Sequence, residues 1–416
     1  MGGLRAMWND VWLLDGVRTA FADYTTALSL VSPTDLGIRA AREVFARSGV
    51  PATDVGVLVA GNVAQASFDA FMLPRHIGLY SGVPVEVPAQ LVQRVCGTGI
   101  EAIIQASDTV AQGRAELGLC VGAESMSRNP VAAYTHRNGF RLGQIEFKDF
   151  LWETLLDTAA DCTMGGTAEN LAKRYQISRT EVDQFAACSF ARAVAAQQSG
   201  FLSGEITPVV NEDFEIPLPG YRPRGIRLPR EVREFATDNH IRPSPLEALA
   251  KLKPAFGGVQ TGGNSSGIVD GAAAALVASG AYVRARGKQP LGRIVASAAV
   301  GVAPEIMGIG PVPAIRAVLE QAAIALDAVD RFEINEAFGA QCLACVRELG
   351  LDPDKVNVNG GAIAIGHPLA ATGVRLSVTV ARELKRSGKR YGIASACIGG
   401  GQGIALLIEN PEAASN

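Results

Sequence analysis

A repeated α/β unit constrains the fold of this chain more than any other feature. Residues 98–121 begin with Thr-Gly, continue with helical apolar spacing, and end in an apolar run before a glycine turn. Residues 372–396 repeat the same order of features. A duplicated α/β unit is the economical explanation, and it predicts two similar halves that each present one turn to a shared site.

The remainder of the chain alternates in the same way. Its 416 residues, 48% of them hydrophobic, exceed what one small core needs, so two or three domains are expected. Helical spacing covers residues 34–48, and the predicted buried strands are residues 11–14, 55–60, 291–297 and 331–334. This alternation predicts an α/β fold with mainly buried strands.

A change in composition divides the chain. Between residues 128 and 263 aromatic, charged and proline residues become frequent, and residues 231–238 have an exposed pattern. We interpret this segment as an insertion between two α/β halves, after which the chain returns through residues 262–267 to an alanine-rich helix. The predicted units are residues 1–127 completed by about 264–288, the insertion 128–263, and residues 289–416.

Charge and termini exclude several classes of protein. With 38 basic and 41 acidic residues the net charge is -3, so no long-range field attracts nucleic acid or an anionic membrane. No apolar run reaches the roughly 18 to 20 residues of a membrane span. The start carries neither a secretory nor a transit pattern, and the end is not a peroxisomal tripeptide. We expect a soluble, cytoplasmic protein with its seven cysteines reduced.

Three glycine-flanked turns carry reactive side chains: Cys96, His367 and Cys397. Taken alone, each of these glycine-flanked segments could equally be a tight structural turn or part of a functional site. Cys96 taken alone could also be a buried, inert thiol. Cys96 also precedes a predicted helix, whose N-terminus favours a thiolate. Together, two cysteines and an imidazole suggest nucleophilic acyl chemistry, with the second thiol suited to proton transfer.

The remaining cysteines and histidines indicate no metal. Cys342 and Cys345 form a C-x-x-C inside an apolar helical pattern, which favours two core thiols over a metal or redox site. His136 and His240 lie among polar loop residues and are expected at the surface.

Nine sequence blocks together resemble the thiolases, the acetyl-CoA C-acyltransferases. They occur in the order of that family and span nearly the whole chain. The blocks are CGTG from Cys96, GAESMS from Gly122, MGGTAE from Met164, LKPAF from Leu252, GNSSG from Gly263, MGIGP from Met307, NEAF from Asn335, residues 360–368, and CIGGG from Cys397.

The resemblance implies a fold and a substrate. We expect two similar five-stranded halves in a layered α-β-α-β-α arrangement, with residues 128–263 as a loop domain over the coenzyme A channel. Acyl-CoA and CoA would be substrates, with no permanently bound cofactor and no metal. The family's assemblies imply a homodimer or a homotetramer.

The resemblance also implies residue roles. Cys96, activated by His367, would attack the 3-keto carbonyl, and Cys397 would protonate the enolate of acetyl-CoA and then activate the incoming CoA. Asn335 would hold a water in the enolate site, and the amides of Cys96 and Gly399 would bind the acyl-transfer oxyanion. The family match offers six substrate contacts: Ser266, Met164, Phe256, Met307, Phe338 and Arg242.

Two departures bear on the substrate. Thr163 stands where acetoacetyl-CoA-specific biosynthetic thiolases usually have histidine, and residues 256–260 are shorter than usual. Broad or medium- to long-chain thiolysis is therefore favoured over a short-chain biosynthetic activity, which remains the alternative. Three other functions are less consistent with the sequence. A ketoacyl synthase usually has a second histidine where this chain has Cys397, and in a Rossmann dehydrogenase the glycine turn leads into a helix, whereas the turn at Gly399 leads into a strand. A non-catalytic thiolase-like protein would have lost a reactive residue, and none is lost here.

Overall fold

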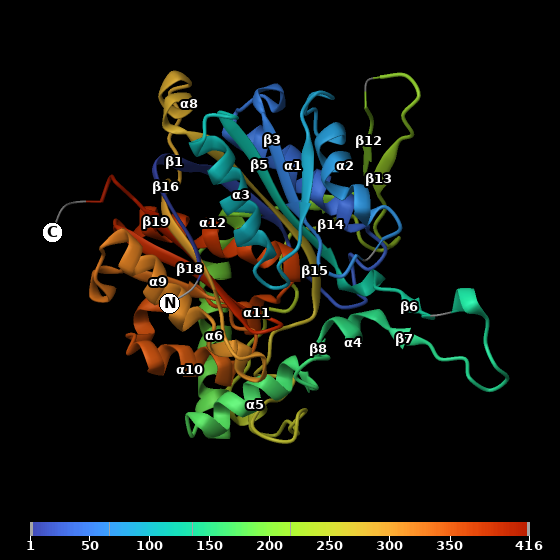
Figure 1. The fold of residues 1–416 in the computed structure, drawn as a ribbon, viewed down its shortest axis with the longest axis vertical. Helices are drawn as coiled ribbons and strands as arrows, with labels where there is room; N and C mark the ends of the chain where they lie inside the picture. Colours follow the sequence, from blue (N-terminus) through green and yellow to red (C-terminus); the bar gives the residue numbers. More distant parts are fainter. Residues whose placement is uncertain (1–2, 66, 135, 217, 414–416) are drawn as a thin grey trace.

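The computed structural model describes residues 3–65, 67–134, 136–216 and 218–413 (Figure 1). The two predicted halves meet along strand β1 (Leu4–Thr19). The first part of β1 pairs antiparallel with β16 (Gly292–Gly301), and its second part pairs antiparallel with β15 (Val269–Ser279). One continuous sheet path results, in the order β17-β18-β19-β16-β1-β15-β5-β3-β4.

Each half repeats one strand order, as the duplication predicts. The other strands of this path are β3 (Val57–Gly61), β4 (Ala89–Val92), β5 (Leu117–Ser125), β17 (Arg331–Ile334), β18 (Tyr391–Ile398) and β19 (Gln402–Glu409). In both halves a parallel pair, β3 with β5 or β17 with β18, continues into antiparallel strands. Among the described residues the second half has four strands, and a single bridge between Phe332 and Val356 takes the fifth position.

Helices complete the layers of the predicted fold. The main helices are α1 (Pro33–Ser48), α2 (Leu73–Tyr80), α3 (Thr98–Ala111), α9 (Pro311–Ala322), α10 (Gly339–Leu349) and α12 (Leu369–Ser387). α3 and α12 lie in the middle layer, α1 and α2 pack on the first half, and α9 and α10 pack on the second (Figure 1). The layered α-β-α-β-α prediction is therefore confirmed.

The repeated Thr-Gly pairs explain how the two central helices approach each other. A Cβ atom on Gly99 of α3 would lie 2.5 Å from the amide nitrogen of Val374 and 2.7 Å from the carbonyl oxygen of Ala370. A Cβ on Gly373 of α12 would lie 2.3 Å from the amide nitrogen of Ile100. Only glycine permits this backbone contact, which brings together the starts of the two helices that follow Cys96 and His367.

The predicted alanine-rich helix after residue 267 is wrong, because this run forms strand β15. β15 is buried on both faces, with β1 and β5 at its edges and with α1, α3 and α12 packed against it. Alanine favours a helix in isolation, but propensity is weak beside tertiary pairing. Small side chains suit a strand enclosed by three helices, where Gly271 leaves room for the Phe21 ring.

Residues 128–263 hold mostly short elements. The helices are α4 (Phe150–Thr154), α5 (Met164–Arg174), α6 (Arg179–Gln198) and α7 (Leu246–Leu249). The strands are β6 (Val131–Ala132), β7 (Lys148–Asp149), β8 (Leu156–Asp157), β9 (Cys162–Thr163), β10 (Ile206–Thr207), β11 (Val209–Val210), β12 (Glu212–Phe214), β13 (Arg224–Ile226) and β14 (Glu234–Phe235). Elsewhere lie β2 (Ala22–Asp23), α8 (Gly280–Ala285) and α11 (Ala362–Ile365).

A buried ion cluster fixes this segment to β1. Residues 231–238 are mostly exposed or partly exposed, as the sequence predicts, but Asp238 is an exception. Asp238 is buried, and its two carboxylate oxygens accept from Arg18 at 2.7 and 2.8 Å. The Nε of Arg18 donates to Glu205 at 2.7 Å. Arg18 has an ordinary surface appearance in the sequence, so nothing local shows that it pairs across 220 residues.

Candidate active site

Two of the three reactive turns open onto one cavity of about 240 Å³. Cys96 and His367 line it from different halves of the molecule. The rest of the wall is mostly apolar and includes Met126, Leu155, Met164, Phe256, Ser266, Ile268, Met307, Phe338 and Leu369. A largely apolar pocket with few convergent polar groups is the usual form of a ligand site.

Cys96 lies on a tight turn before α3. Val95 has a φ of 43°, and the Thr98 hydroxyl donates to the carbonyl of Val95 at 2.6 Å and accepts from the amide of Arg94 at 2.9 Å. Burial raises the pKa of the Cys96 thiol to about 11, although the amides of Gly399 and of Cys96 itself lower it. The thiol is therefore protonated in the free protein, so the helix start does not by itself produce the thiolate that the sequence suggested.

His367 follows Gly366, whose φ of 102° is in a region that favours glycine. Its Nδ1 lies 2.6 Å from the Thr372 hydroxyl, which donates its single hydrogen to the carbonyl of Pro368 at 3.0 Å. Nδ1 therefore carries the proton and donates to Thr372, which leaves Nε2 unprotonated beside the amide nitrogen of Asn335 at 3.2 Å. Burial and the Arg375 charge lower the pKa of His367 to about 3, so the imidazole is neutral and can accept a proton.

Thr372 gives a testable prediction. We expect Thr372→Val to reduce the rate of acylation by up to about 10²-fold, because the imidazole loses the acceptor that fixes its tautomer and orientation. Stopped-flow measurement of CoA release from an acyl-CoA checks this, and Thr372→Ser should restore most of the rate. Wild-type acylation by the valine variant would contradict the positioning role.

Cys397 is the second-last residue of β18 rather than part of a turn, and Gly399 begins the turn between β18 and β19. Cys397 is buried and packs in an apolar cluster with Met164, Met307 and Ala337. Burial raises the pKa of Cys397, and the nearby Cys96 sulfur raises it further. Gly399 places its amide on the Cys96 sulfur. The structure thus gathers the predicted catalytic residues around one point.

Five of the six predicted substrate contacts line the cavity, and Arg242 does not. Met164, Phe256, Ser266, Met307 and Phe338 all line the cavity. The rings of Phe256 and Phe338 meet edge to face with centroids 6.0 Å apart.

Arg242 and Thr163 lie outside this wall. Arg242 is exposed, and its Nη1 donates to the carbonyl of His240 at 2.8 Å. Thr163 caps α5 by accepting from the amide of Gly166 at 3.1 Å, so its side chain serves the helix. Its effect on specificity would therefore be indirect.

Several residues at the site were not predicted. In the sequence, Thr372 is recognisable only as part of the repeated unit, and Glu124 only as part of the GAESMS block. Neither pattern indicates which residues these side chains contact. His240, expected at the surface, is largely buried: its ring packs near Phe190 and against Gly267, and its Nδ1 lies beside Asp23. The predicted core thiols Cys342 and Cys345 are both buried.

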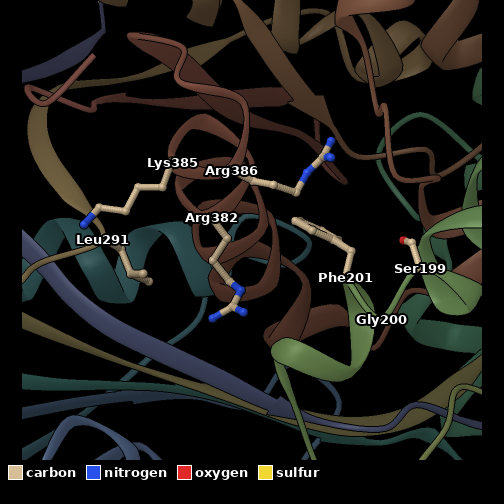
Figure 2. A pocket seen from close by; sticks show the side chains of 7 residues that line it. All are labelled: Ser199, Gly200, Phe201, Leu291, Arg382, Lys385 and Arg386. Atoms are coloured by element: carbon tan, nitrogen blue, oxygen red, sulfur yellow. The ribbon is translucent and has the colours of Figure 1, made fainter. Parts of the chain in front are cut away.

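A second, more open cavity of about 460 Å³ lies away from these residues (Figure 2). It is lined by Ser199, Gly200, Phe201, Leu291, Arg382, Lys385 and Arg386. Figure 2 shows that the three cationic side chains diverge, with Lys385 extending toward Leu291 and Arg386 beside the Phe201 ring. Its lining residues include no thiol or imidazole, so the smaller cavity is the candidate active site.

Comparison with known proteins shows which family the chain resembles over its length. The thiolase N-terminal domain model matches residues 11–281, and the thiolase C-terminal domain model matches residues 288–410. A mitochondrial 3-ketoacyl-CoA thiolase of Bos taurus is 41% identical over 409 residues, covering 97% of this chain and 99% of that protein. An acetyl-CoA acetyltransferase of Pseudomonas aeruginosa is 41% identical over 402 residues, with 96% and 99% covered.

A solved structure extends the similarity to three dimensions. The human mitochondrial 3-ketoacyl-CoA thiolase in complex with CoA superposes with a TM-score of 0.90 at 40% identity, covering 96% of this chain and 98% of that one. Both halves, their order and nearly their full lengths are matched. The chain belongs to the thiolase family of acyltransferases.

Proposed function

We propose that this protein catalyses the reversible, CoA-dependent thiolytic cleavage of 3-ketoacyl-CoA to acetyl-CoA and a shortened acyl-CoA through an acyl-enzyme on Cys96. One observation carries the proposal: Cys96 and His367 line the same apolar cavity, with the imidazole oriented by Thr372 and two amides acting on the thiol. Nucleophile, base and orienting group are the parts that covalent acyl transfer requires.

The first half-reaction follows from the protonation states. His367 accepts the thiol proton as the Cys96 sulfur attacks the 3-keto carbonyl, and the oxyanion that forms is stabilised by the amides of Cys96 and Gly399. Each such donor is worth on the order of 3 kcal/mol of barrier. Cleavage of the carbon-carbon bond leaves the shortened acyl group as a thioester on Cys96 and releases acetyl-CoA as its enolate. His367 and a water held by Asn335 would stabilise the enolate oxygen.

Cys397 completes both halves of the cycle. It donates its proton to the enolate carbon, which yields acetyl-CoA, and the resulting thiolate takes the proton of the incoming CoA thiol. That CoA then attacks the thioester and regenerates the Cys96 thiolate, which recovers its proton from His367. The high pKa of the buried Cys397 thiol suits proton transfer to carbon, and neither this thiol nor that of Cys96 loses its proton without a specific acceptor.

A broad or medium- to long-chain substrate range is the favoured form of this activity. The cavity wall is mostly apolar, and residue 163 is threonine rather than the histidine that acetoacetyl-CoA-specific thiolases usually have. The alternative, short-chain biosynthetic acetoacetyl-CoA thiolysis, is favoured by the similarity to the acetyl-CoA acetyltransferase of Pseudomonas aeruginosa.

Thiolysis across a series of 3-ketoacyl-CoA chain lengths tests the range. We expect kcat/KM to rise from acetoacetyl-CoA to longer chains by up to about 15-fold for each well-buried pair of methylene groups, since each buried methylene contributes about 0.8 kcal/mol. A maximum at acetoacetyl-CoA would support the short-chain alternative. Failure to cleave every member would contradict a catalytic thiolase.

The proposal also covers the cofactor requirement, the oligomeric state and the cellular location of the enzyme. CoA serves as a substrate and no cofactor is held permanently, with a homodimer or homotetramer in the cytoplasm as the working form. The human relative was solved in complex with CoA, which supports the first point. None of the helices in the described parts of the chain has the length and apolarity to cross a membrane.

A further inference from the structure

Glu124 is a buried carboxylate that the proposed mechanism does not use. It is the second-last residue of β5, has 0% exposure, and lies on the same side of the strand as Cys120 and Gly122. That side faces the central helices, since Cys120 contacts the carbonyl of Ala102 and Gly122 lies against Ala370. Among the described residues, none of the recorded salt bridges gives Glu124 a cationic partner.

Four N-H donors surround this carboxylate instead of a cation. Oε2 accepts from the amides of Val63 at 3.1 Å and Ala370 at 3.0 Å. Oε1 accepts from the amide of Ala64 at 3.1 Å and from the side chain of Asn62 at 2.9 Å. Each donor retains its hydrogen permanently, so only an ionised carboxylate satisfies all four.

One of these donors belongs to the start of α12. The residue before this helix is Pro368, which makes no side-chain capping bond, so an amide of the first turn needs an acceptor from elsewhere. Glu124 supplies it from β5, and its negative charge is favourable beside a helix N-terminus. The same helix carries Thr372, which orients His367.

A second donor, the amide of Val63, belongs to a residue that lies close to the nucleophile. Val63 and Ala370 share one apolar cluster with Cys96 and Leu369. Glu124 also acts directly on the thiol, because its charge contributes to raising the pKa of Cys96. Glu124 pairs with Gly271 of β15. Burial raises the pKa of Glu124 to about 7, and the charge of Asp270 also raises it.

We propose that Glu124 is a positioning residue for acyl transfer, which holds residues 62–64 and the start of α12 in the places that bring Cys96 and His367 together. The inference rests on the proposed function, since it assigns Glu124 to the same acyl-enzyme site. Two consequences are separable: the carboxylate fixes geometry through its four donors, and its charge restrains ionisation of the thiol.

Glu124→Gln tests the inference, with Glu409→Gln as the matched control. Glu409 is also buried, at 4% exposure, and pairs with Arg293 and Arg390 at the end of β19 remote from the Gly399 turn. We expect Glu124→Gln to reduce kcat for thiolysis by about 10²-fold, because the amide cannot accept from all four donors. The pH midpoint for alkylation of Cys96 by iodoacetamide should shift downward, because a negative charge is lost. Glu409→Gln should change neither quantity.

Glu124→Asp keeps the test falsifiable if the glutamine variant fails to fold. Aspartate retains the charge but loses the reach, so turnover should fall while the alkylation midpoint stays closer to the wild-type value. An unchanged midpoint and turnover in Glu124→Gln would overturn the inference, as would equal losses in the Glu124 and Glu409 variants. A wild-type enzyme that forms no acyl adduct on Cys96 would instead contradict the proposed function.

Discussion

Cys96→Ala should lower kcat for thiolysis by at least about 10⁴-fold, the largest effect of any single substitution in this protein. The acyl group has nowhere to bond once the sulfur is gone, because Cys96 supplies the only thiol among the described residues that line the cavity. The substitution removes only the sulfur atom and leaves a small space, so the variant should remain folded. Steady-state assay of 3-ketoacyl-CoA cleavage, with thermal melting of each protein, checks both statements.

A matched control separates loss of the nucleophile from loss of any cysteine. Cys188→Ala removes an exposed thiol of α6 that lies outside the cavity, and its kcat should equal that of the wild type. Substantial cleavage by Cys96→Ala, with the fold intact, would mean that a different residue carries the acyl group.

Cys397→Ala should block turnover but leave acylation of Cys96 intact, whereas Cys96→Ala should abolish both. Acylation of Cys96 by an acyl-CoA requires only Cys96 and His367, so the adduct should form at a rate close to that of the wild type. Turnover should fall by about 10²- to 10⁴-fold, because enolate protonation and CoA activation lose their acid and base. Rapid-quench measurement of adduct formation beside steady-state turnover gives the two rates separately.

Cys342→Ala is the control for this second prediction. Cys342 is another fully buried thiol of the second half, but it lies on α10, in the core, rather than near the Gly399 turn. Its variant should lose stability without losing either rate selectively. If Cys397→Ala slowed acylation and turnover by the same factor, a separate proton-transfer role for Cys397 would be untenable.

Much of the fold was accessible from the sequence because its local patterns agree with its tertiary structure. The helices predicted at residues 34–48 and 340–349 are α1 and α10, since apolar spacing and caps define them locally. The repeated Thr-Gly pairs predicted the duplication, and the structure adds their reason, the contact between Gly99 and Gly373. The family blocks indicated which glycine turns would meet around Cys96.

What the sequence did not show depends on distant partners. β15 is rich in alanine, a strong helix former, but this run becomes a strand because β1 and β5 pair with both its edges. Asp238 and His240 have polar neighbours in the sequence but are enclosed by β1 and by Gly267. Thr372 and Glu124 act through contacts that only the folded chain creates. The domain boundaries, the residue roles and the cytoplasmic location remain predictions.

Intact-mass spectrometry of the wild-type protein after mixing with acetyl-CoA tests the acyl-enzyme most directly. The account predicts one added acetyl group, mapped by peptide analysis to Cys96, removed by free CoA, and absent from Cys96→Ala. An adduct that persists in Cys96→Ala, or thiolysis without any covalent adduct on the wild type, would contradict it.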